Sequence, residues 1–259
     1  MARWRDRRNQ LNCMTFASYV IIAFAILVSS FISGVFGMAG GLILLGVLLN
    51  YFDVPSGMIL FSIIQLCANG WRAFQWRRYV RWPIFFKYLG GAAISFVAMY
   101  SIKFVPNKMM VYLSLGMMPF VIEALPKTWR PNIEWRGVPF VTGVLTTIVQ
   151  VLAGVGGLFL DIFFQKSMLD RKTTNATKAT VQTFSHVVRA CYFIALFGAG
   201  SVPHWALAPA VALAIAATSL APFVIERMTD HGFRQWTRAI IFAVSAVYLV
   251  RGGLLLWRG

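Results

Sequence analysis

Charged residues are scarce in this sequence, and acidic ones most of all. Asp and Glu contribute only eight residues, and charged residues together make up 12% of the chain, against about 25% in a soluble domain. Apolar residues make up 59%, and the mean hydropathy is +0.70. This composition excludes a disordered chain and argues against a water-soluble enzyme. It predicts an all-α polytopic membrane protein, with the lipid bilayer as its surroundings.

The sequence also lacks the patterns of metal and catalytic sites. Its three cysteines form no CxxC pair, and its three histidines never recur at helical spacing. These residues are Cys13, Cys67, Cys191, His186, His204 and His231. There is no P-loop, GxGxxG, GxSxG or HExxH motif. We therefore expect no metal, no cofactor and no enzymatic activity.

Long apolar segments fill most of the chain. A helix that crosses about 30 Å of hydrocarbon needs about 20 mainly apolar residues. Eight elements are predicted on this basis, at 14–51, 56–75, 84–102, 108–125, 137–165, 175–198, 204–226 and 236–257. The linkers between them are short and carry helix breakers, among them Pro55 and Pro83.

Two of these elements are too long for a simple span and contain glycine clusters. The segment 14–51 contains Gly34-Val-Phe-Gly-Met-Ala-Gly-Gly41, and the segment 137–165 contains Ala153-Gly-Val-Gly-Gly157. Glycine destabilises a helix and lets its backbone unwind. Each long element is therefore predicted to be two half-helices joined near the middle of the membrane. Close helix packing at GxxxG faces is the alternative explanation of these glycines.

The glycine breaks indicate an internal repeat. Gly40-Gly41 superimposes on Gly156-Gly157 at an offset of 116 residues, and the helix that follows carries Gln and Arg pairs at an offset of 117. Residues 1–126 and 127–259 are thus predicted to form two four-element repeats within one membrane unit. Matching interrupted segments in two halves are the best sequence pointer to a transporter binding site.

Basic residues predict the topology. Of the 24 Lys and Arg residues, fifteen fall at 72–87, 127–136, 166–178 and 227–238, and only two at 50–57, 100–108 and 198–204. The first set is predicted to be cytoplasmic, which requires the element 137–165 to be re-entrant. If 14–51 is re-entrant too, the halves are inverted repeats, which we favour. The four N-terminal arginines favour an inside N-terminus, so the side of the N-terminus stays open. The excess of basic over acidic residues thus indicates the orientation of the loops in the membrane. We therefore expect no nucleic-acid partner.

The glycine breaks resemble those of the TauE/SafE family, the sulfite and sulfonate exporters. The resemblance lies in Ser33-Gly-Val-Phe-Gly-Met-Ala-Gly-Gly-Leu42 and Val151-Leu-Ala-Gly-Val-Gly-Gly-Leu158, with Asn175-Ala176-Thr177 in the helix after the second. Ala39 and Val155 stand where the family pattern has a first glycine, and no proline follows shortly after either break. The resemblance implies a bacterial inner-membrane carrier of small sulfur-containing anions.

The candidate site is built around these breaks. A half-helix that starts inside the membrane directs free N–H groups at the site, and such N-termini bind anions. Gly40, Gly41, Gly156 and Gly157 open the two half-helices. Gln65 and Asn69 share one helical face in the first half, and a matching face in the second half consists of Gln182, Ser185, His186 and Arg189. These faces are predicted to bind substrate, with interhelical hydrogen bonding as the alternative.

Arg189 and Asp161 are the charges within apolar segments. An arginine deep in a span is functional by default and suits an oxyanion, although it can also pair with a carbonyl group or with Asp161. Asp161 and His186 are candidates for proton coupling, and Asp161 can equally lie near the surface.

The sequence thus predicts a secondary transporter of a small anion, such as sulfite or sulfoacetate, that works by alternating access. A passive channel is the main alternative, and a membrane-embedded enzyme or redox component is less favoured. A homo-oligomer is left open.

Overall fold

In the computed structural model, residues 15–36, 39–154, 156–198, 204–225, 227 and 230–258 are described, and they contain ten α-helices and no β-strand. The helices are α2 (Phe16–Phe36), α3 (Ala39–Tyr51), α4 (Val54–Gln75), α5 (Trp82–Ser101), α6 (Lys108–Ala124), α7 (Val138–Ala153), α8 (Gly157–Phe164), α9 (Arg171–Phe197), α10 (His204–Ile225) and α11 (Asp230–Arg258). Two short 3₁₀ turns follow α4 and α6, at Arg77–Tyr79 and Lys127–Trp129. The predicted all-helical class is confirmed.

Four helices are long and apolar enough to cross a membrane. They are the helices or stretches Phe16–Phe36, Val54–Gln75, Trp82–Ser101 and Gln235–Trp257. Large apolar side chains lie exposed along several of them, including Phe24, Phe86, Val97 and Leu254. An exposed apolar surface of this extent fits contact with lipid rather than with water.

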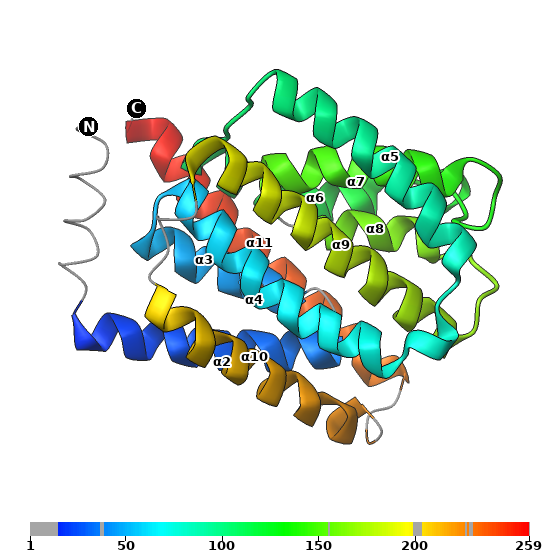
Figure 1. The fold of residues 1–259 in the computed structure, drawn as a ribbon, viewed down its shortest axis with the longest axis horizontal. Helices are drawn as coiled ribbons and strands as arrows, with labels where there is room; N and C mark the ends of the chain where they lie inside the picture. Colours follow the sequence, from blue (N-terminus) through cyan, green and yellow to red (C-terminus); the bar gives the residue numbers. More distant parts are fainter. Residues whose placement is uncertain are drawn as a thin grey trace.

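Both long elements are interrupted at their glycine clusters. The first divides into α2 and α3, with residues 37 and 38 outside the described part, and the second divides into α7 and α8. Gly154 ends α7 in the left-handed conformation, at φ +80°, which glycine adopts without a steric penalty. Each pair forms a hairpin, and the two hairpins begin and end at opposite ends of the bundle (Figure 1).

Helices α4, α5 and α9 begin earlier than predicted, and side chains cap the first turns of α4 and α9. Pro55 and Pro83 were expected in linkers, but they lie in the first turns of α4 and α5, where proline leaves no hydrogen bond unmade. The Asp53 carboxylate accepts the Ser56 N–H at 3.0 Å. Asp170 caps α9 in the same way, so that this helix starts at Arg171 instead of 175.

The helix packing is symmetric under exchange of the two halves. Exchange of the halves replaces α2 by α7, α3 by α8, α4 by α9, α5 by α10 and α6 by α11. Under this exchange the contact α5/α7 becomes α2/α10, and both of these pairs pack extensively. In the same way α5/α9 becomes α4/α10, and α6/α8 becomes α3/α11. The pairs α4/α9 and α6/α11 are their own counterparts. Helices α4 and α9 run in opposite directions at the centre of the bundle (Figure 1). Their facing surfaces bring together the polar residues singled out from the sequence.

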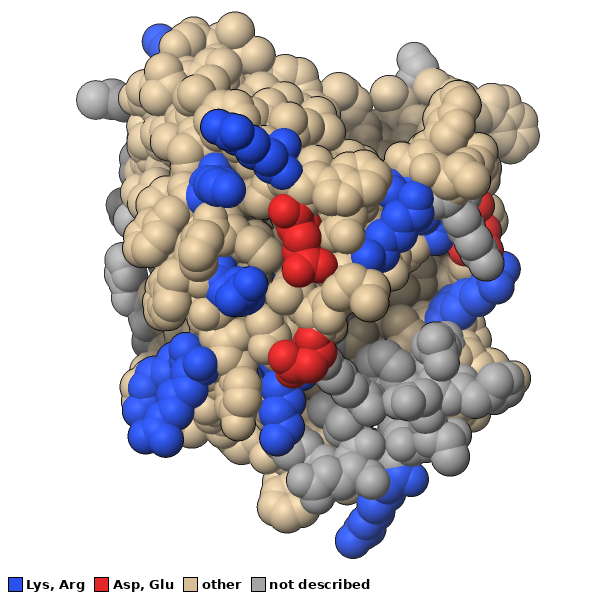
Figure 2. Space-filling view, turned by 90° about the vertical axis from the view of Figure 1, so that its right-hand side faces the viewer, with Lys and Arg blue, Asp and Glu red and all other residues tan. Residues whose placement is uncertain are grey.

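The loops of the predicted basic set all lie at one end of the bundle. The segments 75–82, 124–138 and 164–171 lie at the right-hand end in Figure 1, together with the end of α10 and the start of α11. Viewed from that side, Lys and Arg side chains gather on the surface around a few acidic ones (Figure 2). We call this the basic end. The N-terminal arginines lie outside the described residues.

Candidate functional site

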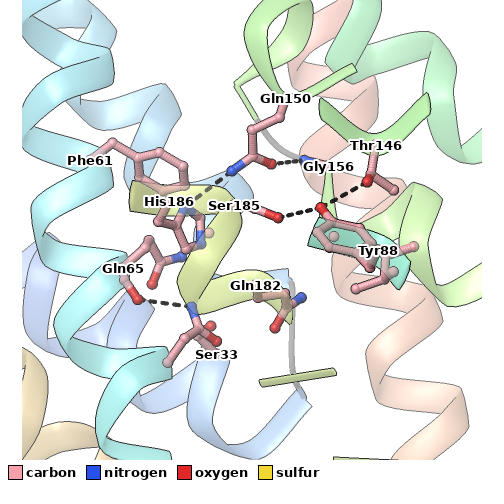
Figure 3. A pocket seen from close by; sticks show the side chains of 14 residues that line it. Ser33, Phe61, Gln65, Tyr88, Thr146, Gln150, Gly156, Gln182, Ser185 and His186 are labelled. Atoms are coloured by element: carbon pink, nitrogen blue, oxygen red, sulfur yellow. Dashed lines mark hydrogen bonds between the residues drawn. The ribbon is translucent and has the colours of Figure 1, made fainter. Parts of the chain in front are cut away.

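A small polar cavity lies between the two halves of the bundle. Its volume is about 20 Å³, which is room for little more than a water molecule. Its walls come from α2, α3, α4, α5, α7, α8 and α9 (Figure 3). The lining residues are Ser33, Gly41, Phe61, Gln65, Asn69, Tyr88, Thr146, Gln150, Gly156, Gly157, Leu160, Gln182, Ser185 and His186.

Most of the predicted site residues meet at this cavity. Eight of the ten predicted substrate-binding residues line it, and Gly40 and Arg189 do not. The start of α3 contributes Gly41, and the start of α8 contributes Gly156 and Gly157. The first turns of two half-helices from different repeats therefore reach the same cavity.

The two glycines at the start of α3 have different surroundings. A Cβ atom on Gly40 would lie 1.9 Å from the Ser29 carbonyl oxygen, so Gly40 permits the close approach of α2 and α3. A Cβ atom on Gly41 would lie 2.6 Å from Nε2 of Gln65, inside the cavity. Close helix packing was the alternative explanation of the glycine clusters. It explains Gly40, whereas Gly41 faces the cavity. The Gln65 Oε1 atom is buried and has no hydrogen-bond partner among the described residues.

A hydrogen-bond network that sequence reasoning missed forms one wall. The Tyr88 hydroxyl lies 2.6 Å from Ser185 Oγ and accepts a hydrogen bond from Thr146 Oγ1 at 2.9 Å. It joins α5, α7 and α9 (Figure 3). The spacing of Thr142, Thr146 and Gln150 along one face of α7 was a signal that could have identified this wall.

Gln150 connects the second glycine break to His186. Its Oε1 accepts the Gly156 N–H at 2.7 Å, and its Nε2 lies 3.2 Å from Nδ1 of His186. The same Nδ1 atom is 3.0 Å from a terminal nitrogen of Arg189. A guanidinium group only donates hydrogen bonds, so Nδ1 is the acceptor. His186 is then neutral with its proton on Nε2, and that N–H is a donor for the site.

Arg189 lies behind this wall, completely buried. Its Nε donates to Ser62 Oγ at 2.7 Å, and one terminal nitrogen donates to the Gly154 carbonyl. Its guanidinium carbon lies 4.4 Å from the centre of the Phe61 ring. Arg189 therefore hydrogen-bonds to α4 and to the C-terminal end of α7. Among its hydrogen-bond partners, His186 is the one that lines the cavity. Pairing with a carbonyl group was one of the alternatives considered for this residue.

Arg72 is the equivalent arginine in the first half and is only partly buried. It donates to Asn69 Oδ1 at 2.7 Å, to Gln182 Oε1 at 3.0 Å and to the Ser33 carbonyl at 3.3 Å. All three partners line the cavity. Arg72 lies in the last turn of α4, a position from which an arginine can either snorkel to the membrane surface or bind a ligand.

Asp161 does not pair with Arg189. Its carboxylate forms an ion pair with Lys178 on α9, and the two side chains are 34% and 20% exposed. Asp161 thus faces the basic end beside the cavity. Its predicted role in proton coupling stays a prediction. No group of His, Cys, Asp and Glu residues that could hold a metal ion occurs in the described part of the chain.

Comparison with known proteins supplies the family. The sequence matches the family described as Sulfite exporter TauE/SafE over residues 21–249. No curated protein and no solved structure matches the chain. Because the match extends over most of the sequence, this chain belongs to the TauE/SafE family, and it is a multi-pass membrane transporter of the sulfite-exporter type.

Proposed function

We propose that the protein carries a small sulfur-containing oxyanion or organosulfonate, such as sulfite or sulfoacetate, by alternating access around the cavity between its halves. The residues proposed to form the site are Gly41, Gln65, Asn69, Gly156, Gly157, Gln182, Ser185 and His186, with Tyr88, Thr146 and Gln150 in support. Arg189 contributes through His186, and Gly40 through the packing of α3 on α2. The membrane is proposed to be the bacterial inner membrane.

The observation that carries the proposal is the convergence of two half-helix N-termini on an enclosed polar cavity. Free N–H groups at the start of a helix carry about half a positive charge. The cavity adds the Nε2–H of His186 and the amide N–H groups of Gln65. Donors of this kind can hydrogen-bond the oxygens of an oxyanion.

The symmetry of the packing supports an inverted repeat. Exchange of the halves preserves the helix pairs, and α4 and α9 are antiparallel at the centre. The hairpins α2/α3 and α7/α8 belong to opposite ends of the bundle, as two re-entrant elements of inverted repeats would. With the basic end in the cytoplasm, α2 starts on the outer side.

The size of the cavity supports a carrier more than a channel. A volume of about 20 Å³ is too small for the four non-hydrogen atoms of sulfite. Substrate binding must widen the space between the halves, so binding and conformational change are coupled. Such coupling is the basis of alternating access.

Reconstitution into proteoliposomes tests this proposal. Uptake of radiolabelled sulfite should saturate and should be accelerated by unlabelled sulfite on the opposite side, with sulfoacetate, taurine and thiosulfate as competitors. Saturable uptake without this acceleration would favour a channel, and absence of uptake for every sulfur anion would refute the proposal. Runs with and without a pH gradient test proton coupling.

A matched pair of variants connects uptake to the cavity. Gly41→Ala should abolish uptake in folded protein, because the added Cβ lies 2.6 Å from Gln65 Nε2. Gly70→Ala on α4 is the control, since its Cβ would meet only Thr183 Cγ2, at 3.6 Å. Equal uptake by both variants would place the substrate elsewhere. Light scattering of the purified protein would determine whether it is a homo-oligomer.

A further inference from the structure

We propose that Arg72 is the cationic residue that contacts the transported anion, and that its equivalent, Arg189, is a structural residue. This inference rests on the proposed function and assigns the charged ligand within the same site. The two arginines stand at an offset of 117 residues, in helices α4 and α9. Their surroundings differ in a way that separates their roles.

The two arginines flank the cavity from opposite ends. Arg189 donates to Ser62 Oγ, and Ser62 precedes Arg72 by ten residues on the same helix. At 1.5 Å per residue, the backbone positions of Ser62 and Arg72 lie about 15 Å apart along α4. Arg72 lies toward the basic end, and Arg189 toward the other end.

The guanidinium of Arg189 is closed off from a substrate. All three of its nitrogens have protein partners, its flat face covers Phe61, and its side chain is completely buried. An anion could reach it only after Phe61 and His186 had moved. Its three hydrogen bonds join α4, the end of α7 and α9 into one unit.

The side chain of Arg72, in contrast, is only partly buried. Its Nε is buried and has no acceptor among the described residues, and the acceptors of its other nitrogens are all uncharged. Asp161 is close enough to interact electrostatically with Arg72, but its carboxylate pairs with Lys178. The charges of Arg72, Asp161 and Lys178 therefore sum to +1.

The partners of Arg72 place it where an anion must pass. Asn69 and Gln182 line the cavity and hold the guanidinium at its basic end through single hydrogen bonds. An oxyanion that enters from this end can replace these amide oxygens with its own oxygens. A planar guanidinium gives an oxyanion two parallel hydrogen bonds, and the exchange releases the two amides to turn toward the same ligand.

Uptake kinetics with radiolabelled sulfite test this assignment. Arg72→Gln should raise the KM for sulfite by about 10- to 100-fold, the range that corresponds to one charge-assisted hydrogen bond. Arg72→Lys should give a smaller rise, because an ammonium group cannot form the planar fork. Arg77→Gln removes one positive charge from an exposed position at the same end and should leave the KM within about twofold of the wild type.

Thermal unfolding provides a second measurement, the rise in Tm that sulfite causes. A residue with a purely structural role would not change this rise. Sulfite should raise the Tm of the wild type, and this rise should be lost in folded Arg72→Gln when each protein is compared with its own Tm without sulfite. Arg189→Gln should lower the Tm without sulfite. If Arg72→Gln does not fold, the KM of Arg72→Lys decides.

The possible failures can be distinguished. Wild-type KM values in folded Arg72 variants, or an equal rise in Arg77→Gln, would overturn the role of Arg72 and leave the proposed function standing. Absence of sulfite uptake and binding by the wild type would overturn both.

Discussion

The crossing of α5 and α7 provides the sharpest test of how packing positions the site. A Cβ atom on Gly91 of α5 would lie 2.0 Å from the carbonyl oxygen of Phe140 on α7. Ordinary contact begins at 3.4 Å, so Gly91→Ala requires the two backbones to separate by about 1.4 Å. Gly90 is the matched control, because its Cβ would meet only the Phe140 ring, at 3.6 Å.

This separation has an energetic and a functional consequence. Overpacking of a close contact costs about 1–3 kcal/mol, which for a chain of this size lowers the Tm by roughly 2–12 °C. The Tyr88 hydroxyl on α5 and Thr146 on α7 are 2.9 Å apart, and a shift of this size takes them beyond hydrogen-bonding distance. Gly91→Ala should therefore melt earlier and transport more slowly, whereas Gly90→Ala should match the wild type in both respects.

The assay follows tryptophan fluorescence of the detergent-solubilised protein on heating, which the nine tryptophans make sensitive, and initial uptake rates in proteoliposomes. Equal melting temperatures for Gly90→Ala and Gly91→Ala would refute the reasoning, because they would mean that α5 and α7 can separate without cost. A lowered Tm with normal uptake would show that the Tyr88 network is not needed by the site.

Three further predictions concern single groups. His186→Asn should fold and should raise the KM for sulfite about tenfold in proteoliposome uptake, because the Nε2–H donor is lost; an unchanged KM would remove His186 from the site. Asp161→Asn and Lys178→Gln should be coupled by about 0.2–1 kcal/mol in a double-mutant cycle of unfolding, as expected for a partly exposed ion pair; additive effects would contradict the pair. Hydrogen bonds from the Thr173 hydroxyl and backbone lower the pKa of Asp170 below its ordinary value of 3.8, so this carboxylate stabilises the fold above that value and less as the pH falls through its native pKa. Asp170→Ala should melt earlier than the wild type at pH 7, and the difference should shrink below pH 3.8; a pH-independent difference would exclude the charged cap.

Much of the fold could be predicted because the responsible signals are local. The lengths of the apolar runs set the helices, and the glycine clusters set the breaks at α2/α3 and α7/α8. The charge pattern placed four loops together at the basic end, where the structure has them. The starts of α4 and α5 were less accurate, since a proline reads as a breaker although it is equally suited to a first helical turn.

The site could be predicted only in part, for a physical reason. A polar residue within a span indicates its depth in the membrane, but the packing of neighbouring helices decides whether it faces a cavity. Arg189 was singled out because it lies deep within an apolar segment. Its partners come from α4 and from the end of α7, and the spacing of residues in the sequence does not reveal these contacts. Tyr88 was missed because a tyrosine in an apolar segment looks like a core residue until its hydroxyl is seen beside Ser185.

The two ends of the cavity differ in the side chains that close them. Phe61 covers the end that Arg189 occupies, and the residue 117 positions later is Lys178, which faces Asp161 at the basic end. The side chains of Lys178 and Asp161 are 20% and 34% exposed, and separating a partly exposed ion pair costs little. Opening the other end would expose Phe61 and remove Arg189 from three hydrogen bonds.

The basic end should therefore open first. A cysteine substituted for Gln182, in a protein whose native cysteines have been replaced, should react with a membrane-impermeant thiol reagent from the basic side, and sulfite should change the rate. A cysteine substituted for Ser62 should react slowly from the other side. The reverse order would mean that the ion pair, and not the buried arginine, is the stronger barrier.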